Sequence, residues 1–322
     1  MSDLQKIWNR QKKFDKFFVD TVAKDLKIYD EDCTVEAREL RTKELAYHMI
    51  RELTELIEET NSKPHVLSKK EVNKQNIIEE YIDIFKYFIN IGLTWGIEAD
   101  DVIKEFERKS TVVEQKFNQE LMLRKLTSDD KIAAIDIDGV LAAYPQSVFD
   151  WALTNNLISR SYETVDEFLF DRHSFAEWHA IKHKYRSMGG KQFAKLLPGA
   201  KELLDTLRGL GFKIVLLTAR PYQKYIRIFA DTIAWLKMNE LHFDAIIFNR
   251  DKEDVVLSRF PNNVHIFVDD DAANVLKVAK AGVNLCYVVG STVGSYQFHD
   301  NVLYAHDNFG VIASINDLKG TL

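Results

Sequence analysis

The hydrophobic pattern of this chain changes once, near residue 130, and that change limits the fold more than any other feature. Residues 1–120 repeat apolar side chains at helical spacing and show no strand-like alternation. From residue 132 onward, short apolar runs alternate with helical segments, which predicts a parallel sheet covered by helices on both faces. The sequence therefore predicts two domains, an all-α bundle over 1–126 and a Rossmann-like α/β domain over 131–322.

Five strands are expected in the second domain, and one long segment interrupts their alternation with helices. The expected strands cover 132–137, 213–217, 245–248, 264–268 and 286–289. The segment at about 145–197 is rich in aromatic side chains and helical in character, which predicts a small cap inserted into the α/β domain. The turn at Gly189 and Gly190 is expected to join cap and core rather than to bind phosphate.

Composition excludes several classes of protein. A hydrophobic content of 46% and a charged content of 29% are typical of a globular protein. The formal charge of −6 argues against sequence-independent nucleic-acid binding, which needs a basic face. The two cysteines, Cys33 and Cys286, predict no disulfide framework. No apolar stretch reaches about 18 residues, so we expect a soluble cytoplasmic protein with no membrane segment.

Four acidic residues in the helical half occur in pairs with helical spacing. Residues at i and i+3 share a helix face, so each pair projects together. The four are Glu52, Glu55, Glu80 and Asp83. If the two helices pack antiparallel, the carboxylates converge and need a hard divalent cation such as Mg²⁺. The alternative is a solvated helix face, but Asp83 lies inside an apolar run, where a charge needs a partner.

The sequence around these acids resembles a known family. RELTELIEE and EEYIDIFKYFINIGLTWGIEADDVIKEF, within about 4–118, are similar to the all-α NTP pyrophosphatases, which include MazG and the dimeric dUTPases. The phage dUTPase/dCTPase branch is the most similar. The resemblance implies that the four acids bind Mg²⁺ and that a metal-held water cleaves a nucleoside triphosphate to monophosphate and pyrophosphate. It also implies a homo-oligomer, and substrate contacts from Gln11 and Lys109.

A second acidic set follows the expected strands. Asp136 and Asp138 come at the end of the first strand, and Asp269 and Asp270 at the end of the fourth. Thr218 ends the second strand and Lys252 follows the third. In an open parallel sheet, ligands bind beyond the carboxyl ends of the strands, so these side chains are expected to meet. A carboxylate nucleophile, Mg²⁺ and phosphate-holding groups suit phosphoryl transfer.

Residues 131–290 resemble the haloacid dehalogenase (HAD) phosphohydrolases through these motifs. The resemblance implies Asp136 as nucleophile, Asp138 as general acid/base and Asp270 as principal metal ligand, with Asp136, Asp138 and Asp269 also near the metal. It implies that Thr218 and Lys252 hold the phosphate. The order TARP…NRDK…FVDDD is most similar to the 5′(3′)-deoxyribonucleotidases. Further substrate contacts are expected from four residues: Ala219, Arg220, Phe175 and Trp178.

Together the two sets predict a bifunctional nucleotide hydrolase, in which the monophosphate made by the first domain is dephosphorylated by the second. A pyrimidine deoxynucleotide such as dUTP is expected by resemblance. Two alternatives remain open. In the first, the α/β domain acts on another phosphate, such as a DNA 3′-phosphate; in the second, the helical domain serves only for dimerisation.

Overall fold

The fold is seen in a computed structural model that describes residues 1–22, 27–30, 33–61, 71–290 and 299–318. The chain forms two compact units, Met1–Lys109 and Ser110–Leu322. The division falls within one long helix, α4 (Ala99–Leu123). The predicted fold class is confirmed, since a helical first part is followed by an α/β part. The boundary near 126 stays a prediction. Within the described ranges, no helix has the length and apolar character to cross a membrane.

The helical unit contains α1 (Asp3–Val22), α2 (Val35–Glu58), α3 (Lys74–Thr94) and the first turns of α4. Helices α2 and α3 run antiparallel, as three contacts between them show. Contacts from the start of α2 go to the end of α3, and contacts from the end of α2 go to the start of α3. The pairs are Thr42 with Trp95, His48 with Tyr87, and Glu59 with Asn76. This packing sets the two acidic pairs opposite one another, as the sequence predicted.

The core of the helical unit is small. Trp8, Ile89, Leu93 and Ala99 form its buried cluster. A buried ion pair joins Arg41 on α2 to Asp15 on α1 at 2.8 Å. Many large apolar side chains on these helices stay exposed, which leaves surface for a further contact.

The α/β unit is built on a six-stranded sheet of order β3-β2-β1-β4-β5-β6, in which every neighbouring pair is parallel. The strands are β1 (Ile132–Ile135), β2 (Lys213–Thr218), β3 (Ala245–Phe248), β4 (Val264–Asp269), β5 (Leu285–Val289) and β6 (Val302–Ala305). The chain builds outward from β1 to β3, then returns to the other side of β1 for β4. The ends of β1 and β4 therefore flank the switch point, where ligands of such sheets bind. The sequence did not predict β6, a short edge strand.

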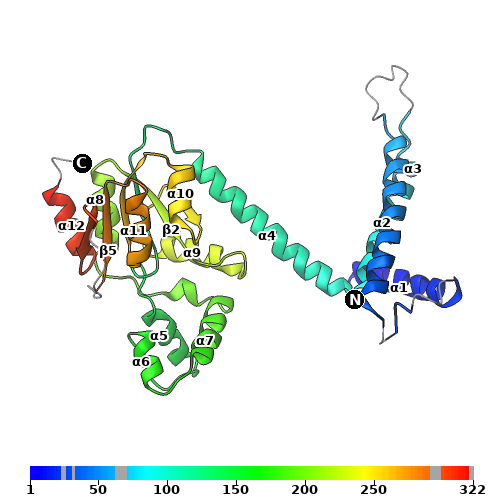
Figure 1. Ribbon diagram of the computed structural model, residues 1–322, viewed down its shortest axis with the longest axis horizontal. Helices are drawn as coiled ribbons and strands as arrows, with labels where there is room; N and C mark the ends of the chain where they lie inside the picture. Colours follow the sequence, from blue (N-terminus) through cyan, green and yellow to red (C-terminus); the bar gives the residue numbers. More distant parts are fainter. Residues whose placement is uncertain (23–26, 31–32, 62–70, 291–298, 319–322) are drawn as a thin grey trace. The chain divides into compact units, whose positions relative to one another are not determined.

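Helices cover both faces of the sheet (Figure 1). One apolar cluster joins alternate strand residues to α8 (Ala200–Gly209), α9 (Arg227–Met238) and α12 (Asn308–Asp317). The other joins the remaining strand residues to α10 (Lys252–Arg259) and α11 (Ala272–Lys280). This is the doubly covered sheet that the continuous apolar strands predicted.

The predicted cap is present after β1. It contains α5 (Gln146–Thr154), α6 (Val165–Phe170), α7 (Phe175–Ser187) and a 3₁₀ turn, η2 (Gly190–Phe193). The cap has its own buried cluster around Phe149 and Phe168. Its last turn is anchored on α9, because the Trp235 indole donates to the Ala194 carbonyl at 2.6 Å. The α/β core thus holds the residues at the end of the cap, where the chain leads back toward the sheet.

The last turns of α4 complete the sheet at its β3 edge. The Gln119 side-chain oxygen accepts a hydrogen bond from the Phe248 backbone N–H at 3.1 Å, and Gln115 donates to the Ile226 carbonyl at 2.9 Å. An edge strand presents unpaired backbone groups, so this contact satisfies a donor that would otherwise be exposed at the edge.

Candidate active sites

The helical unit brings three of its four predicted metal ligands together. Carboxylate oxygens of Glu52, Glu80 and Asp83 lie within 4.8 Å of one another. Partial burial, and then the charges of Glu55 and Glu52, raise the pKa of Glu80. Glu55 itself is exposed and acts on this group through its charge. Oxygen ligands under mutual repulsion suit a hard divalent cation.

Two local cations offset part of this negative charge. Arg51 lies 3.1 Å from Glu52 and 3.5 Å from Glu55, and Lys86 lies 2.7 Å from Asp83. These pairs are within one helix and largely exposed, so their stabilising effect is weak. They do not replace the cation that the converging carboxylates can hold.

The two predicted substrate residues of the helical unit lie in different settings. Gln11 on α1 donates a hydrogen bond of 2.9 Å to Asn90, which is buried on α3. Asn90 follows Asp83 by two helical turns, so Gln11 lies on the acid-bearing side of α3. Lys109 is exposed on α4. Their roles as substrate contacts stay predictions.

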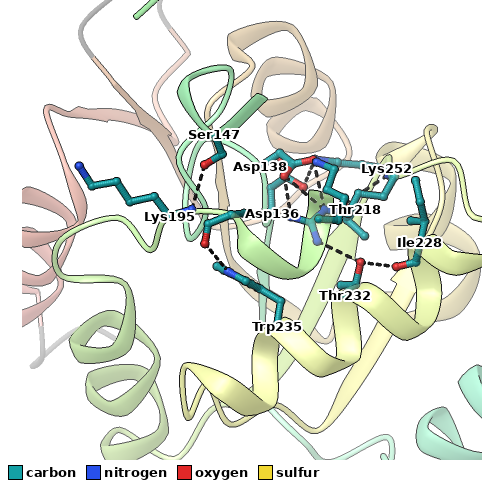
Figure 2. A network of polar contacts seen from close by, with 12 residues as sticks. Asp136, Asp138, Ser147, Lys195, Thr218, Ile228, Thr232, Trp235 and Lys252 are labelled. Atoms are coloured by element: carbon teal, nitrogen blue, oxygen red, sulfur yellow. Dashed lines mark hydrogen bonds and ion pairs between the residues drawn. The ribbon is translucent and has the colours of Figure 1, made fainter. Parts of the chain in front are cut away.

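In the α/β unit, residues from the ends of four strands and from the cap enclose one cavity of about 300 Å³. The predicted members are Asp136, Asp138, Thr218, Ala219, Arg220, Lys252, Asp269 and Asp270; the cap adds Tyr144, Arg186 and Lys191. Lys252 reaches across the strands to Asp136 at 3.0 Å (Figure 2). It also lies 2.6 Å from Asp269. The expected meeting of the strand ends is therefore present.

Crowded carboxylates make this cavity a candidate metal site. Oxygens of Asp136, Asp269 and Asp270 lie within 4.8 Å of one another. Burial, opposed by Lys252, together with the charges of Asp269 and Asp138, raises the pKa of Asp136 to about 7. The surrounding protein and the charge of Asp136 raise the pKa of Asp270 to about 8, although its carboxylate is open to solvent. One lysine does not neutralise the group, so a divalent cation fits it.

Asp269 is held more firmly than its neighbours. It is fully buried, accepts from the Asp271 backbone N–H at 2.9 Å, and accepts from Asn274 at 3.4 Å. Lys252 donates to the same Asp269 oxygen as Asn274, and the Asp271 N–H donates to the other, so both oxygens of Asp269 are held. The Asp270 carboxylate lies against Gly139, and its role as principal metal ligand stays a prediction.

Asp138 is clamped between two cations that come from different parts of the chain. Arg220 lies 2.6 Å from one carboxylate oxygen, and Lys191 lies 2.6 Å from the other. Burial alone would raise the pKa of Asp138, but the charges of Arg220 and Lys191 outweigh it and hold this pKa well below its usual range. Arg220, expected to contact substrate, is thus engaged with Asp138 and also donates to Thr232 at 3.0 Å.

Lys191 was missed by the sequence, although Gly189 and Gly190 precede it. A Cβ at Gly190 would lie 2.1 Å from the Tyr185 ring, and Gly189 has φ of +86°. The two glycines therefore let the chain pass close to α7 and deliver Lys191, which is 3% exposed, to Asp138. A lysine after a glycine pair, at the return from cap to core, was the available signal.

The aromatic residues of the cap divide into packed and exposed members. Trp178 is 4% exposed and stacks on Phe149 with ring centroids 4.9 Å apart, and Tyr185 is also buried. Phe175 and His179 are exposed. None of these four lines the cavity that holds Asp136. Base contacts from Phe175 and Trp178 stay predictions, and Tyr144 is the aromatic side chain that borders the cavity.

Residues 3–174 match the model of a protein family described as dUTPase. That match covers more than half of the 322 residues. The chain belongs to the dUTPase family. The match includes the whole helical unit and continues through β1 into the cap. No curated protein matches the chain.

Several solved structures resemble the α/β unit at low identity. A HAD-superfamily hydrolase from Ehrlichia chaffeensis is 16% identical with a TM-score of 0.37, covering 58% of this chain and 96% of that chain. A D,D-heptose 1,7-bisphosphate phosphatase from Burkholderia thailandensis is 16% identical with a TM-score of 0.36, covering 58% and 99%. With TM-scores below 0.5, these likenesses are no evidence of a shared activity.

Replacing Gly139 should disable the α/β site. Gly139 has φ of +89°, and a Cβ there would lie 2.0 Å from an oxygen of Asp270. We expect Gly139→Ala to displace that carboxylate and to lower the turnover of a reaction catalysed at this site by about a hundredfold. Gly282→Ala is the matched control, because its φ is +98° but nothing lies within 4 Å of the new Cβ. Equal turnover in the two variants would contradict the placement of Asp270.

Mg²⁺ should bind the strand ends more tightly as the pH rises. The metal-free pKa values of Asp136 and Asp270 are raised to about 7 and about 8, so the folded protein holds protons that Mg²⁺ must displace. Each of these two groups contributes fully to the free energy of unfolding below its ordinary pKa of 3.8. That contribution is lost as the pH rises through the raised pKa of the folded protein.

Calorimetric titration of the Glu80→Gln variant, in which the helical site is weakened, measures this effect. We expect clearly tighter binding at about pH 8 than at about pH 5.5. Asp270→Asn in the same background should remove most of the binding at both values. Equal affinity at the two pH values would refute the charge-crowding account.

Proposed function

We propose that this chain is a bifunctional nucleotide hydrolase. Its helical unit converts a (d)NTP to a (d)NMP and pyrophosphate, and its α/β unit removes the remaining phosphate to give a nucleoside. The observation that carries the proposal is that one chain of the dUTPase family has two clusters of carboxylates, each suited to Mg²⁺. One cluster lies on two helices and the other at the ends of parallel strands. The product of the first reaction has the chemistry that the second site needs.

The first reaction is assigned to the acids of α2 and α3. Glu52, Glu80 and Asp83 would hold Mg²⁺, which polarises the triphosphate and lowers the pKa of water. Gln11, fixed by Asn90, would face the nucleotide base. We infer dUTP or another pyrimidine deoxynucleotide as the substrate, on the family membership and the sequence resemblance. Membership of the phage branch stays a prediction.

The second reaction is assigned to the strand ends, with a 5′-nucleotidase of the HAD type as the fitting activity. An Asp136 oxygen attacks the phosphorus, the bond to the nucleoside oxygen breaks, and that oxygen takes a proton from Asp138. Water then attacks the phosphorus, Asp138 regains a proton, and inorganic phosphate leaves with Asp136 restored. Mg²⁺ at Asp270 would neutralise the approaching anions. Lys252 keeps Asp136 aimed at the phosphate.

Asp138 can donate a proton only after its two cations find another partner. In the ligand-free site, Arg220 and Lys191 hold it as a carboxylate. A bound phosphate dianion is the natural competitor for these cations. We infer that substrate entry draws Lys191 and Arg220 toward the phosphate, so that the pKa of Asp138 rises and it takes up from solvent the proton that it then donates to the leaving oxygen.

Blocking the second reaction should reveal the first. Incubating dUTP, dCTP, dTTP and dATP with the Asp136→Asn variant and Mg²⁺ should accumulate one monophosphate, whereas the wild type yields a nucleoside. Asp83→Ala combined with Glu80→Ala should stop triphosphate cleavage but leave monophosphate hydrolysis intact. Nucleotide products are followed by anion-exchange chromatography. A wild type that accumulates monophosphate without dephosphorylating it would exclude the tandem scheme.

A 3′-phosphorylated oligonucleotide belongs in the same panel. Its hydrolysis in preference to dUMP would move the α/β unit to a different substrate. Unchanged triphosphate turnover after loss of Glu80 and Asp83 would leave the helical unit as a dimerisation module.

We further propose that the helical unit forms a homo-oligomer. Its buried cluster is small, while side chains such as Phe14, Tyr47, Ile50 and Phe106 are more than half exposed. Such a density of exposed apolar side chains is typical of a surface that another subunit covers. Location in the cytoplasm stays a prediction.

Light scattering should therefore give a mass at least twice the chain mass of 37.3 kDa. Ile50→Asp should weaken the association, because a charge would be buried at the contact. Leu257→Asp is the control, since Leu257 on α10 is 51% exposed and Ile50 is 56% exposed. A monomeric wild type at micromolar concentration would contradict the proposal.

A further inference from the structure

Three cationic side chains and one histidine gather beside the α/β cavity without an acidic partner. Lys182, His183 and Arg186 lie on α7, and Lys224 lies in the loop that follows β2. Within the described part of the chain, none of the four forms an ion pair with a carboxylate. We call this set the cationic cluster.

Three members of the cationic cluster surround Tyr225, which is buried, whereas Lys182 lies over the Trp178 ring at 5.0 Å. The Arg186 guanidinium lies 5.9 Å from the centre of the Tyr225 ring, and the Lys224 ammonium lies 5.7 Å from it. The His183 nitrogen Nδ1 is 3.0 Å from the Tyr225 hydroxyl. One aromatic ring thus holds cations from two separate elements in one place.

The cationic cluster borders the reaction centre through Arg186. This arginine lines the same cavity as Asp136, Thr218 and Lys191. The other cations of that cavity are engaged: Lys191 and Arg220 with Asp138, and Lys252 with Asp136 and Asp269. Arg186 is the cavity cation that no described carboxylate neutralises.

Positive charges held close together are unfavourable unless an anion joins them. Burial, followed by the charge of Arg186, lowers the pKa of Lys182, which reports this repulsion. A phosphate group would relieve it, because guanidinium and ammonium groups bind phosphate with charge-assisted hydrogen bonds. The scissile phosphate belongs at Asp136, so the cluster is available for a different one.

We propose that the cationic cluster binds a second phosphate of the substrate, so that the α/β unit prefers deoxynucleoside 3′,5′-bisphosphates to monophosphates. This inference rests on the proposed phosphatase reaction and adds a substrate class to it. One phosphate occupies the reaction centre at Asp136. The other is held by Arg186 and Lys224 at the mouth of the cavity.

The test compares phosphate release from dUMP and from deoxyuridine 3′,5′-bisphosphate by the full-length chain with Mg²⁺. We expect kcat/KM for the bisphosphate to exceed that for dUMP by about tenfold, as one charge-assisted contact implies. In the double variant Arg186→Gln/Lys224→Gln, the ratio of the two values should fall to about one.

A matched control removes the same two positive charges elsewhere. Lys237→Gln/Lys280→Gln changes two exposed lysines, at the ends of α9 and α11, and should keep the wild-type ratio. Circular dichroism of both double variants establishes that they fold.

Three outcomes overturn the inference. The first is a wild-type ratio near one, and the second is an equal loss for both substrates in the Arg186→Gln/Lys224→Gln variant, which would indicate general attraction of anions. The third is a faster reaction with a 3′-phosphorylated oligonucleotide than with the bisphosphate, which would assign the cluster to a nucleic-acid strand. If neither dUMP nor the bisphosphate releases phosphate, the proposed function itself fails, and that result is distinct from these three.

Discussion

Crowding of carboxylates where β1 and β4 end is the constraint on which the α/β unit depends. The order in which strands are added to the sheet reverses between β1 and β4, so the ends of these two strands lie open to a ligand. Asp136 and Asp269 are buried there, and each would be costly to ionise alone. Lys252 lies between them and makes their burial possible. The lysine begins α10, the helix that follows β3, and β2 lies between β3 and β1, so the site depends on the order of the strands.

The same electrostatic need ties the cap to the core. Asp138 takes one cation from the loop after β2 and one from η2, so Arg220 and Lys191 meet on a single carboxylate. Since η2 is anchored on α9 through Ala194, this part of the cap is a fixed wall of the cavity. Among the described residues of the helical unit, Glu52 and Asp83 pair with Arg51 and Lys86, which are exposed cations on their own helices. A bound cation therefore matters more to the arrangement of these carboxylates.

Local sequence could predict the strands and the acids that follow them. Asp136, Thr218 and Asp270 each come directly after an apolar run, and a parallel sheet necessarily gathers such positions. Lys191 could not be found this way, because its place depends on how an inserted cap returns to the core. Trp178 shows the converse difficulty. An aromatic residue in a cap suits a base contact and a small core equally, and the structure packs it against Phe149. Strand β6 was not recognised, because polar residues flank its four positions on both sides.

Helix α4 contributes side chains to both units. Its first turns supply Ala99 and Val102 to the core around Trp8, and its last turns supply Gln119 to the backbone of Phe248. The division by contacts falls between Lys109 and Ser110, inside this helix, and the domain boundary near residue 126 stays a prediction. Each unit thus uses part of one continuous helix.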